Sequence, residues 1–302
     1  MQDLPAFRRY YNDHMHSKLR SFERIRWVLL LKIVLGFITL IALSFFILYA
    51  KLSALILFLP IPYWAFYDYV KREIKQFKKK YKPIVVQGIL DFINPEYRYY
   101  HDQFIAYDTF NRSGIFPVEP AIYKGEDYIM GKIGEVDFEM CELHLEHPSY
   151  VRSRLQKLFD GLFFHSKFNY SAKGSIVIIP RKRRQRFIGT LKNITRYGGY
   201  EVKGTGNSTF DSRFLVFAEP TVKYDEILTP EILESLNSYY ISSKKDVFAS
   251  FVDDHFYLAV SEPYQLLDAN IFRTNISFEI IQAYYRELQV FMRIVEDFDN
   301  SH

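Results

Sequence analysis

Trp27–Ala50 reads WVLLLKIVLGFITLIALSFFILYA, and this stretch decides the architecture. Its one charged residue, Lys32, lies close to the N-terminal end. At about 1.5 Å rise per residue, a helix of this length crosses the roughly 30 Å hydrocarbon core of a bilayer with some tilt. The Lys32 ammonium is near enough to that end to reach the headgroups. The alternative is a buried core helix, but a second apolar run follows at once and favours the membrane.

The second apolar run, Leu52–Val70, reads LSALILFLPIPYWAFYDYV. Pro60 and Pro62 each remove a backbone donor, so we expect them to kink this helix. Aromatic residues crowd its far end, where amphipathic rings prefer the membrane interface. Only Ala50 and Lys51 remain for a turn. We therefore predict a two-helix transmembrane hairpin, with a re-entrant second segment as the alternative.

Basic residues flank the hairpin on one side of the membrane. Those before it are Arg8, Arg9, Lys18, Arg20, Arg24 and Arg26, and those after it are Lys71, Arg72, Lys75, Lys78, Lys79, Lys80 and Lys82. Lys51 stands alone on the other side. The positive-inside rule then places both termini and the large domain in the cytoplasm of a bacterial cell, with the chain multi-pass in the inner membrane. The polar start is too long for a signal peptide, so we expect it to be retained.

Composition agrees with an anchor that carries a soluble domain. The chain has 302 residues, 49% of them hydrophobic and 18% aromatic. A mean hydropathy of −0.12 is too polar for a multi-span transporter. The net charge of +4 is mild and says little about nucleic acid. The single cysteine, Cys141, excludes an intrachain disulfide and suits a reducing compartment.

Four segments follow from these patterns. They are a basic cytoplasmic segment at 1–26, the transmembrane hairpin at 27–70, a basic juxtamembrane helix at 71–82, and a cytoplasmic α+β domain at 83–302. We expect the juxtamembrane helix to end at Lys82-Pro83. Its lysines and arginine are candidates for contact with anionic lipid, at about 1 kcal/mol per basic residue near the surface. A merely topogenic, solvated run is the alternative.

The domain alternates strand and turn patterns, with few helices. We expect a short helix at 101–110, a β-hairpin at 126–146 turning at Gly134-Glu135, strands at 161–168, 175–179 and 214–218, a helix from Thr229-Pro230-Glu231 to about Tyr239, a hairpin at 247–260 turning at Asp253-Asp254, and a long helix from Phe278 to Phe298. The long helix has apolar residues at helical spacing along one face. Too few helices separate the strands for a doubly wound sheet, so the class is α+β.

Several short motifs occur in a characteristic order. They are Ser113-Gly114-Ile115-Phe116, Tyr123-Lys124-Gly125-Glu126-Asp127-Tyr128, Gly131-Lys132-Ile133-Gly134, Phe159-Asp160-Gly161-Leu162-Phe163-Phe164 and Ile227-Leu228-Thr229-Pro230-Glu231. In this order the chain, from the hairpin to the C-terminal helix, resembles a bacterial membrane-protein family known as domain of unknown function 3137. The resemblance implies no established enzymatic activity and no cofactor. Family members are often encoded beside LemA-like proteins, small helical membrane-anchored proteins, which implies a shared assembly.

Candidate chemistry is sparse. Cys141, His144 and His147 have metal-ligand chemistry, but on a strand His144 points away from the other two. Gly204–Thr209 lacks the lysine and the spacing of a P-loop. We therefore predict no catalytic, cofactor-binding or metal-binding residue.

A second basic run follows the strand SIVIIP. Its charged members are Arg181, Lys182, Arg183, Arg184 and Arg186. These charges repel each other unless an anion or an acidic partner is near. A solvated loop is one interpretation, and contact with the inner leaflet or with an acidic protein is the other. Nucleic acid is less favoured, because no aromatic residues are interleaved for base stacking.

The leading functional hypothesis is a non-enzymatic membrane scaffold that forms a homo-oligomer and binds a LemA-like membrane protein. The small residues Gly36, Ala42, Ser44 and Ala54 would allow close approach of membrane helices. Surplus aromatic residues favour interfaces on the domain. The alternative is a membrane-associated enzyme or lipid-handling protein whose site is built from scattered residues.

Overall fold

The computed structural model describes residues 4–116, 119–148, 155–168, 171–187, 199–261 and 269–301. Internal contacts divide it into two compact units. The first, here the helical unit, consists of Met1–Pro95 and Leu266–Tyr285. The second, here the sheet unit, consists of Glu96–Gln265 and Arg286–His302. The chain is therefore α+β, as predicted, with a long apolar N-terminal helix and an antiparallel sheet.

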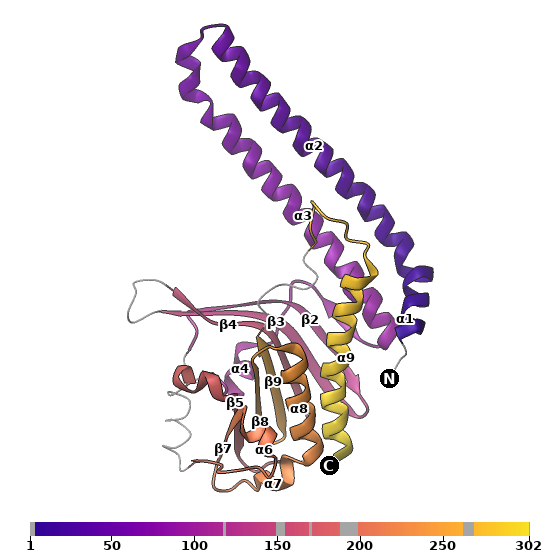
Figure 1. Ribbon diagram of the computed structural model, residues 1–302, viewed down its shortest axis with the longest axis vertical. Coiled ribbons are helices and arrows are strands. Elements are labelled where there is room, and N and C mark those ends of the chain that lie inside the picture. Colours follow the sequence, from indigo (N-terminus) through magenta and orange to yellow (C-terminus); the bar gives the residue numbers. More distant parts are fainter. Residues whose placement is uncertain are drawn as a thin grey trace. The chain divides into compact units, whose positions relative to one another are not determined.

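Two long helices make up most of the helical unit. Its elements are α1 (Leu4–Tyr10), a π-helical stretch (Tyr11–Met15), α2 (His16–Tyr49), a 3₁₀ helix (Ser53–Phe58) and α3 (Pro60–Ile93). Figure 1 shows α2 and α3 running side by side in opposite directions. Among the described residues, one continuous helical stretch, Leu4–Tyr49, is long and apolar enough to cross a membrane.

The second apolar run does not form the single kinked helix that the sequence predicts. After the turn at Lys51, whose φ is 53°, the chain forms the 3₁₀ helix, and α3 begins at Pro60. A proline in the first turn of a helix costs nothing, because the N–H that it lacks would have no intrahelical partner. Pro60 and Pro62 therefore start α3 instead of bending it.

Small residues of α2 are used for packing against α3. A Cβ built on Gly36 would lie 2.3 Å from Cε2 of Phe66, so the ring occupies the space that the glycine leaves open. Nearer the turn, the Ser44 and Tyr63 hydroxyls lie 3.1 Å apart. Two of the four small residues expected to serve contacts between chains thus serve contacts within this one.

Helix α3 continues past the boundary predicted at Lys82-Pro83. Pro83 lies inside the helix, which runs on to Ile93. The interior proline removes one backbone hydrogen bond, but the next two turns bury an apolar face that offsets this cost. That face consists of Val85, Val86, Ile89 and Leu90.

A segment from the C-terminal part of the chain completes the helical unit. The Tyr285 ring, from the start of α9 (Phe278–Ser301), stacks on Phe7 at 4.1 Å between centroids. Tyr11 donates its hydroxyl to the Ile276 carbonyl at 2.6 Å. Arg26 is buried, and its Nη1 donates to the Ile271 carbonyl at 2.8 Å. The polar start of the chain is therefore packed in place.

The sheet unit contains one antiparallel sheet. Its strands are β1 (Arg98–Tyr100), β2 (Ile122–Ile133), β3 (Val136–Pro148), β4 (Leu155–Lys167), β5 (Ser175–Pro180), β6 (Tyr200–Glu201), β7 (Phe214–Ala218), β8 (Val247–Val252) and β9 (His255–Ser261). The described strands follow the order β1-β2-β3-β4-β9-β8-β5-β7-β6. Both predicted hairpins, β2–β3 and β8–β9, are confirmed.

Helices cover both faces of this sheet. Segment 105–116, which includes α4 (Tyr107–Arg112), places Ile105 and Phe110 on one face, in a cluster with Phe163 and Tyr257. Phe214 points to the other face and contacts the Tyr240 ring of α8, at 5.1 Å between centroids. Helix α8 (Pro230–Ser243) starts where the sequence predicts and continues beyond Tyr239. The helix expected at 101–110 is shorter and lies later, at α4.

Candidate functional site

A line of hydrogen-bonded polar side chains crosses four strands on the face that α4 covers. Its members are Tyr128 of β2, Glu139 of β3, His165 of β4 and His255 of β9. Register places them together, because Glu139 pairs with His165 and His165 pairs with Tyr257, two residues from His255. Alternation then directs these side chains to one face. We call this set the histidine line.

The distances form an unbroken chain. Tyr128 donates its hydroxyl to Glu139 Oε2 at 2.6 Å, and the other oxygen, Oε1, lies 2.8 Å from His165 Nδ1. His165 Nε2 lies 2.8 Å from His255 Nδ1. Beyond that ring, His255 Nε2 lies 3.2 Å from Nη1 of Arg112, on α4. The side chains of both histidines are 14% exposed, so the line is shielded.

One proton arrangement satisfies every contact. Arg112 carries donors and no acceptor, so its N–H donates to His255 Nε2. The His255 proton then sits on Nδ1 and is donated to His165 Nε2, and His165 donates from Nδ1 to Glu139. Each ring thus has one N–H and one bare nitrogen. Both histidines are neutral, and Glu139 is a carboxylate that accepts two hydrogen bonds.

Electrostatics in the line agree with this arrangement. Burial opposes ionisation of Glu139, but hydrogen bonds from His165 and Tyr128 outweigh it and lower the pKa of the carboxyl. Burial, with the neighbouring His165 ring, lowers the pKa of His255. Tyr257 stacks on the His165 ring at 4.8 Å, and burial raises the pKa of its hydroxyl to about 12. The neutral form of His255 is therefore favoured near neutral pH.

His255 is the member of the line that can exchange partners. Its Nε2 lies 3.2 Å from the Arg112 guanidinium and 3.4 Å from Asp254 Oδ1. A proton added at Nε2 would oppose Arg112 and favour Asp254, which Lys167 also contacts at 3.3 Å. The hollow beside His255 measures about 10 Å³, which is room for about one water molecule. The geometry suits proton uptake rather than binding of an organic substrate.

Within the described residues, one group has the geometry to hold a metal ion. Glu126, Asp127 and Glu142 each offer a carboxylate oxygen, and the three oxygens lie within 4.8 Å of one another. Asp127 is buried, accepts a hydrogen bond from the Tyr99 hydroxyl, and lies 3.0 Å from His101 Nδ1. Both neighbours contact the same oxygen, Oδ1, within the chain itself, so the group does not by itself define a metal site.

The basic run after β5 is held by acidic and backbone partners within the sheet unit. It forms a short 3₁₀ helix, Arg181–Phe187, instead of the predicted loop. Lys182 Nζ and Arg183 Nη2 contact the two oxygens of buried Asp246 at 2.8 and 2.6 Å. Arg184 pairs with Glu201 at 3.0 Å. Hydrogen bonding to Asp246 raises the pKa of Lys182.

The other residues predicted to contact lipid or a partner differ in their surroundings: some pair within the chain, and others are exposed. Arg181 donates to the Asp211 carbonyl at 2.7 Å, and the side chain of Arg186 lies outside the described residues. On α3, Arg72 pairs with Asp68 at 3.2 Å, and Lys82 is buried. The exposed lysines are Lys71, Lys75, Lys79 and Lys80, and Lys78 is half-buried. Contact of these residues with lipid or a partner stays a prediction.

Sequence reasoning missed the histidine line and Asp246. His165 and His255 are 90 positions apart, and Arg183 and Asp246 are 63 apart. The one available signal was alternation, which places Glu139 on the Cys141 face of its strand. Of the three metal-type residues considered from sequence, Cys141 is buried, while His144 contacts Glu146 at 2.9 Å.

Comparison with known proteins supports part of the resemblance. Residues 157–300 match the model of a family described as protein of unknown function, DUF3137. The match contains two of the five motifs, Phe159–Phe164 and Ile227–Glu231, and both line histidines. A search of curated proteins found no match.

A solved structure gives a distant likeness. It is the crystal structure of the mycobacterial trehalose monomycolate transport factor A, TtfA, at 6% sequence identity and a TM-score of 0.34. The alignment covers 68% of this chain and 92% of that one. We infer neither fold nor function from it.

Proposed function

We propose that this chain is a two-span integral membrane protein of the bacterial inner membrane. One observation carries the proposal: only 11% of the most apolar window in Leu4–Tyr49 is buried within the structure. A helix in a soluble core would bury this surface, since large bare apolar areas are rare in water. The second apolar run has the same character, with Leu57 81% and Trp64 70% exposed. The hydrocarbon core of a bilayer is the environment that suits both apolar runs.

The basic flanks support a cytoplasmic placement of both termini and of the sheet unit. Arg20 and Arg24 precede the hairpin, and the lysine-rich part of α3 follows it, whereas Lys51 alone marks the turn. Short, positively charged flanks are retained on the cytoplasmic side. The two spans would then be α2 and the run from Leu52 to Val70.

Within this placement we propose a non-enzymatic assembly role, with self-association and a LemA-like membrane protein as the partner. Ala42 and Ala54 support it, because both are small and exposed on the apolar surface. Exposed aromatic residues of the sheet unit, such as Tyr100 and Phe104, also support it, because aromatic side chains are enriched in protein–protein interfaces.

Site-directed labelling tests the membrane placement. Lys51→Cys should react with an impermeant maleimide in intact cells, and Glu135→Cys, in the β2–β3 turn, should react only after lysis. The unmodified chain is the control, because burial raises the pKa of Cys141 and keeps its thiol unreactive. Labelling of Glu135→Cys in intact cells would overturn the orientation. Release of the chain by alkaline carbonate would overturn the membrane anchor.

A second candidate is a membrane-associated enzyme or lipid-handling protein. The histidine line favours it, because a shielded carboxylate–histidine pair is common in acid–base chemistry. The 10 Å³ hollow beside His255 is far below the roughly 300 Å³ of small ligand pockets, so we rank this candidate second. Lipid extracted from the purified protein and identified by mass spectrometry tests it. A defined, stoichiometric lipid that is lost from His255→Gln would favour lipid handling at the histidine line, and a lipid retained independently of His255, or none, would leave assembly ahead.

A further inference from the structure

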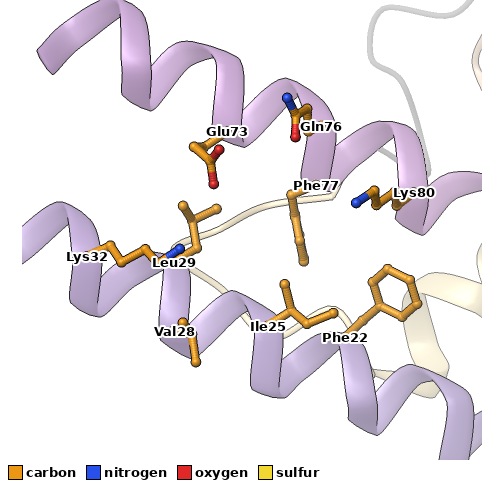
Figure 2. A pocket seen from close by; sticks show the side chains of 9 residues that line it. All are labelled: Phe22, Ile25, Val28, Leu29, Lys32, Glu73, Gln76, Phe77 and Lys80. Atoms are coloured by element: carbon orange, nitrogen blue, oxygen red, sulfur yellow. The ribbon is translucent and has the colours of Figure 1, made fainter.

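A groove separates α2 and α3 in the helical unit, where the apolar run gives way to the basic flanks. It measures about 130 Å³. Its apolar lining comes from four residues of α2 and one of α3, namely Phe22, Ile25, Val28, Leu29 and Phe77 (Figure 2). The inner surface of the groove is therefore apolar, and it lies at the level where a membrane-spanning helix would leave the hydrocarbon core.

Polar side chains rim the same groove. Lys32 and Lys80 lie at opposite ends, and Figure 2 shows the nitrogen of each directed toward the space between the helices. Glu73 and Gln76 complete the rim from α3. Within the described part of the chain, neither lysine has an ion-pair partner. The rim of the groove thus carries two ammonium groups and one carboxylate, a net positive charge.

The position of Lys32 makes this arrangement unusual. Lys32 lies five residues after Trp27, about 7.5 Å along the helix, and is the one charge in Trp27–Ala50. A cation at that depth needs a counter-ion or a path back to water. Lys80 comes from the other helix, so the two charges are brought together by the hairpin and not by their neighbours in sequence.

We propose that the groove binds one anionic phospholipid of the inner leaflet, with its phosphate between Lys32 and Lys80. The acyl chains lie along Val28 and Leu29, toward the apolar end of the groove. The headgroup lies toward Phe22 and Lys80, where Gln76 of α3 can donate hydrogen bonds to its hydroxyl groups or accept them. This inference rests on the proposed membrane placement and names the ligand that the membrane supplies. It differs from a general attraction of basic residues, because it requires two particular lysines.

Native mass spectrometry of the full chain in mild detergent tests the proposal with phosphatidylglycerol and phosphatidylcholine. We expect the wild type to retain one phosphatidylglycerol more strongly than phosphatidylcholine. Lys32→Gln/Lys80→Gln should weaken this binding roughly 25-fold, at about fivefold per lysine. The matched control, Arg20→Gln/Arg24→Gln, removes the same charge from exposed positions of α2 outside the groove and should bind as the wild type does.

Three results would overturn the lipid site. They are equal retention of the two lipids by the wild type, equal weakening in the two double variants, and displacement of the lipid by inorganic phosphate, which would point to free phosphate as the ligand. Carbonate extraction separates this failure from that of the membrane placement. A chain that stays in the membrane pellet but does not select phosphatidylglycerol refutes the groove alone. A chain released by carbonate refutes the placement itself.

Discussion

His165 Nε2 and His255 Nδ1 lie 2.8 Å apart, so two neutral imidazoles share one hydrogen bond between β4 and β9. The contact depends on protonation, because a second proton on either ring places two N–H groups, or an N–H and a guanidinium, against each other. Glu139, Tyr128, Tyr257, Arg112, Asp254 and Lys167 are the charged or titratable groups around the pair.

Acid should destabilise the sheet unit in two steps. Because folding lowers the pKa of His255 below its ordinary 6.5, the unfolded chain binds more protons, and stability falls as pH drops below about 6.5. The pKa of Glu139 is also lowered, so its contribution is present above about 4.5 and is lost below that pH. Thermal unfolding from about pH 7.5 to 5.5 should show a falling midpoint that His255→Gln makes shallower.

His147→Gln is the matched control for this experiment. His147 lies on β3, outside the histidine line, and its Nδ1 contacts the Pro148 carbonyl at 2.9 Å. It should keep the pH dependence of the wild type. The same pH slope in wild type and His255→Gln would show that the line does not sense protons.

The basic run should contribute to stability through Asp246. Lys182→Gln/Arg183→Gln leaves a buried carboxylate without its cations, and we expect a loss of about 2 kcal/mol. This is below the value for a fully buried pair, because the Lys182 and Arg183 side chains are 54% and 42% exposed. Urea unfolding of the wild type and of the double variant measures this loss of unfolding free energy.

Two further variants check that interpretation. Arg184→Gln, which breaks an exposed pair with Glu201, should cost less than about 1 kcal/mol. Adding Asp246→Asn to the double variant should restore part of its stability, because the buried charge is then gone. A double variant as stable as the wild type would indicate that the run is free to bind lipid or a partner.

Close packing of α2 on α3 should depend on Gly36. Gly36→Val places methyl groups where the Phe66 ring lies, and we expect a loss of about 1–3 kcal/mol by overpacking. Phe66→Leu should recover part of it, and Ala42→Val, at an exposed position, should be nearly neutral. Thermal unfolding in detergent measures each variant. An unaffected Gly36→Val would contradict the contact.

Self-association should survive gentle extraction. Mass photometry in mild detergent should detect a species well above one 36.0 kDa chain. Ala42→Leu/Ala54→Leu should reduce it, because larger side chains keep helices apart in the membrane. If the wild type is a monomer in detergent and forms no cross-linked species in native membranes, the proposed assembly role is wrong.

Local patterns predicted the elements whose partners are close in sequence. The turns at Gly134 and Asp253 join neighbouring strands, so alternation and turn chemistry together define both hairpins. The start of α8 at Pro230 was likewise visible in its capping pattern. Element class and most boundaries follow from such signals.

Contacts between distant segments could not be predicted. Pairing of β4 with β9 and of β5 with β8 depends on long-range register, which one sequence does not reveal. The histidine line depends on the first pairing. The helix end predicted at Pro83 was wrong for a related reason. The burial of Val85 and Ile89, and not local propensity, keeps α3 helical beyond this proline.

The two ends of the described sheet are short: β1 has three residues and β6 has two. Each therefore offers few free backbone groups to an incoming strand. Chains tethered to a bilayer meet at high local density, a setting in which long bare edges template amyloid-like stacking. Under the proposed membrane anchor, short edge strands would let many copies crowd on one membrane without polymerising through their backbones.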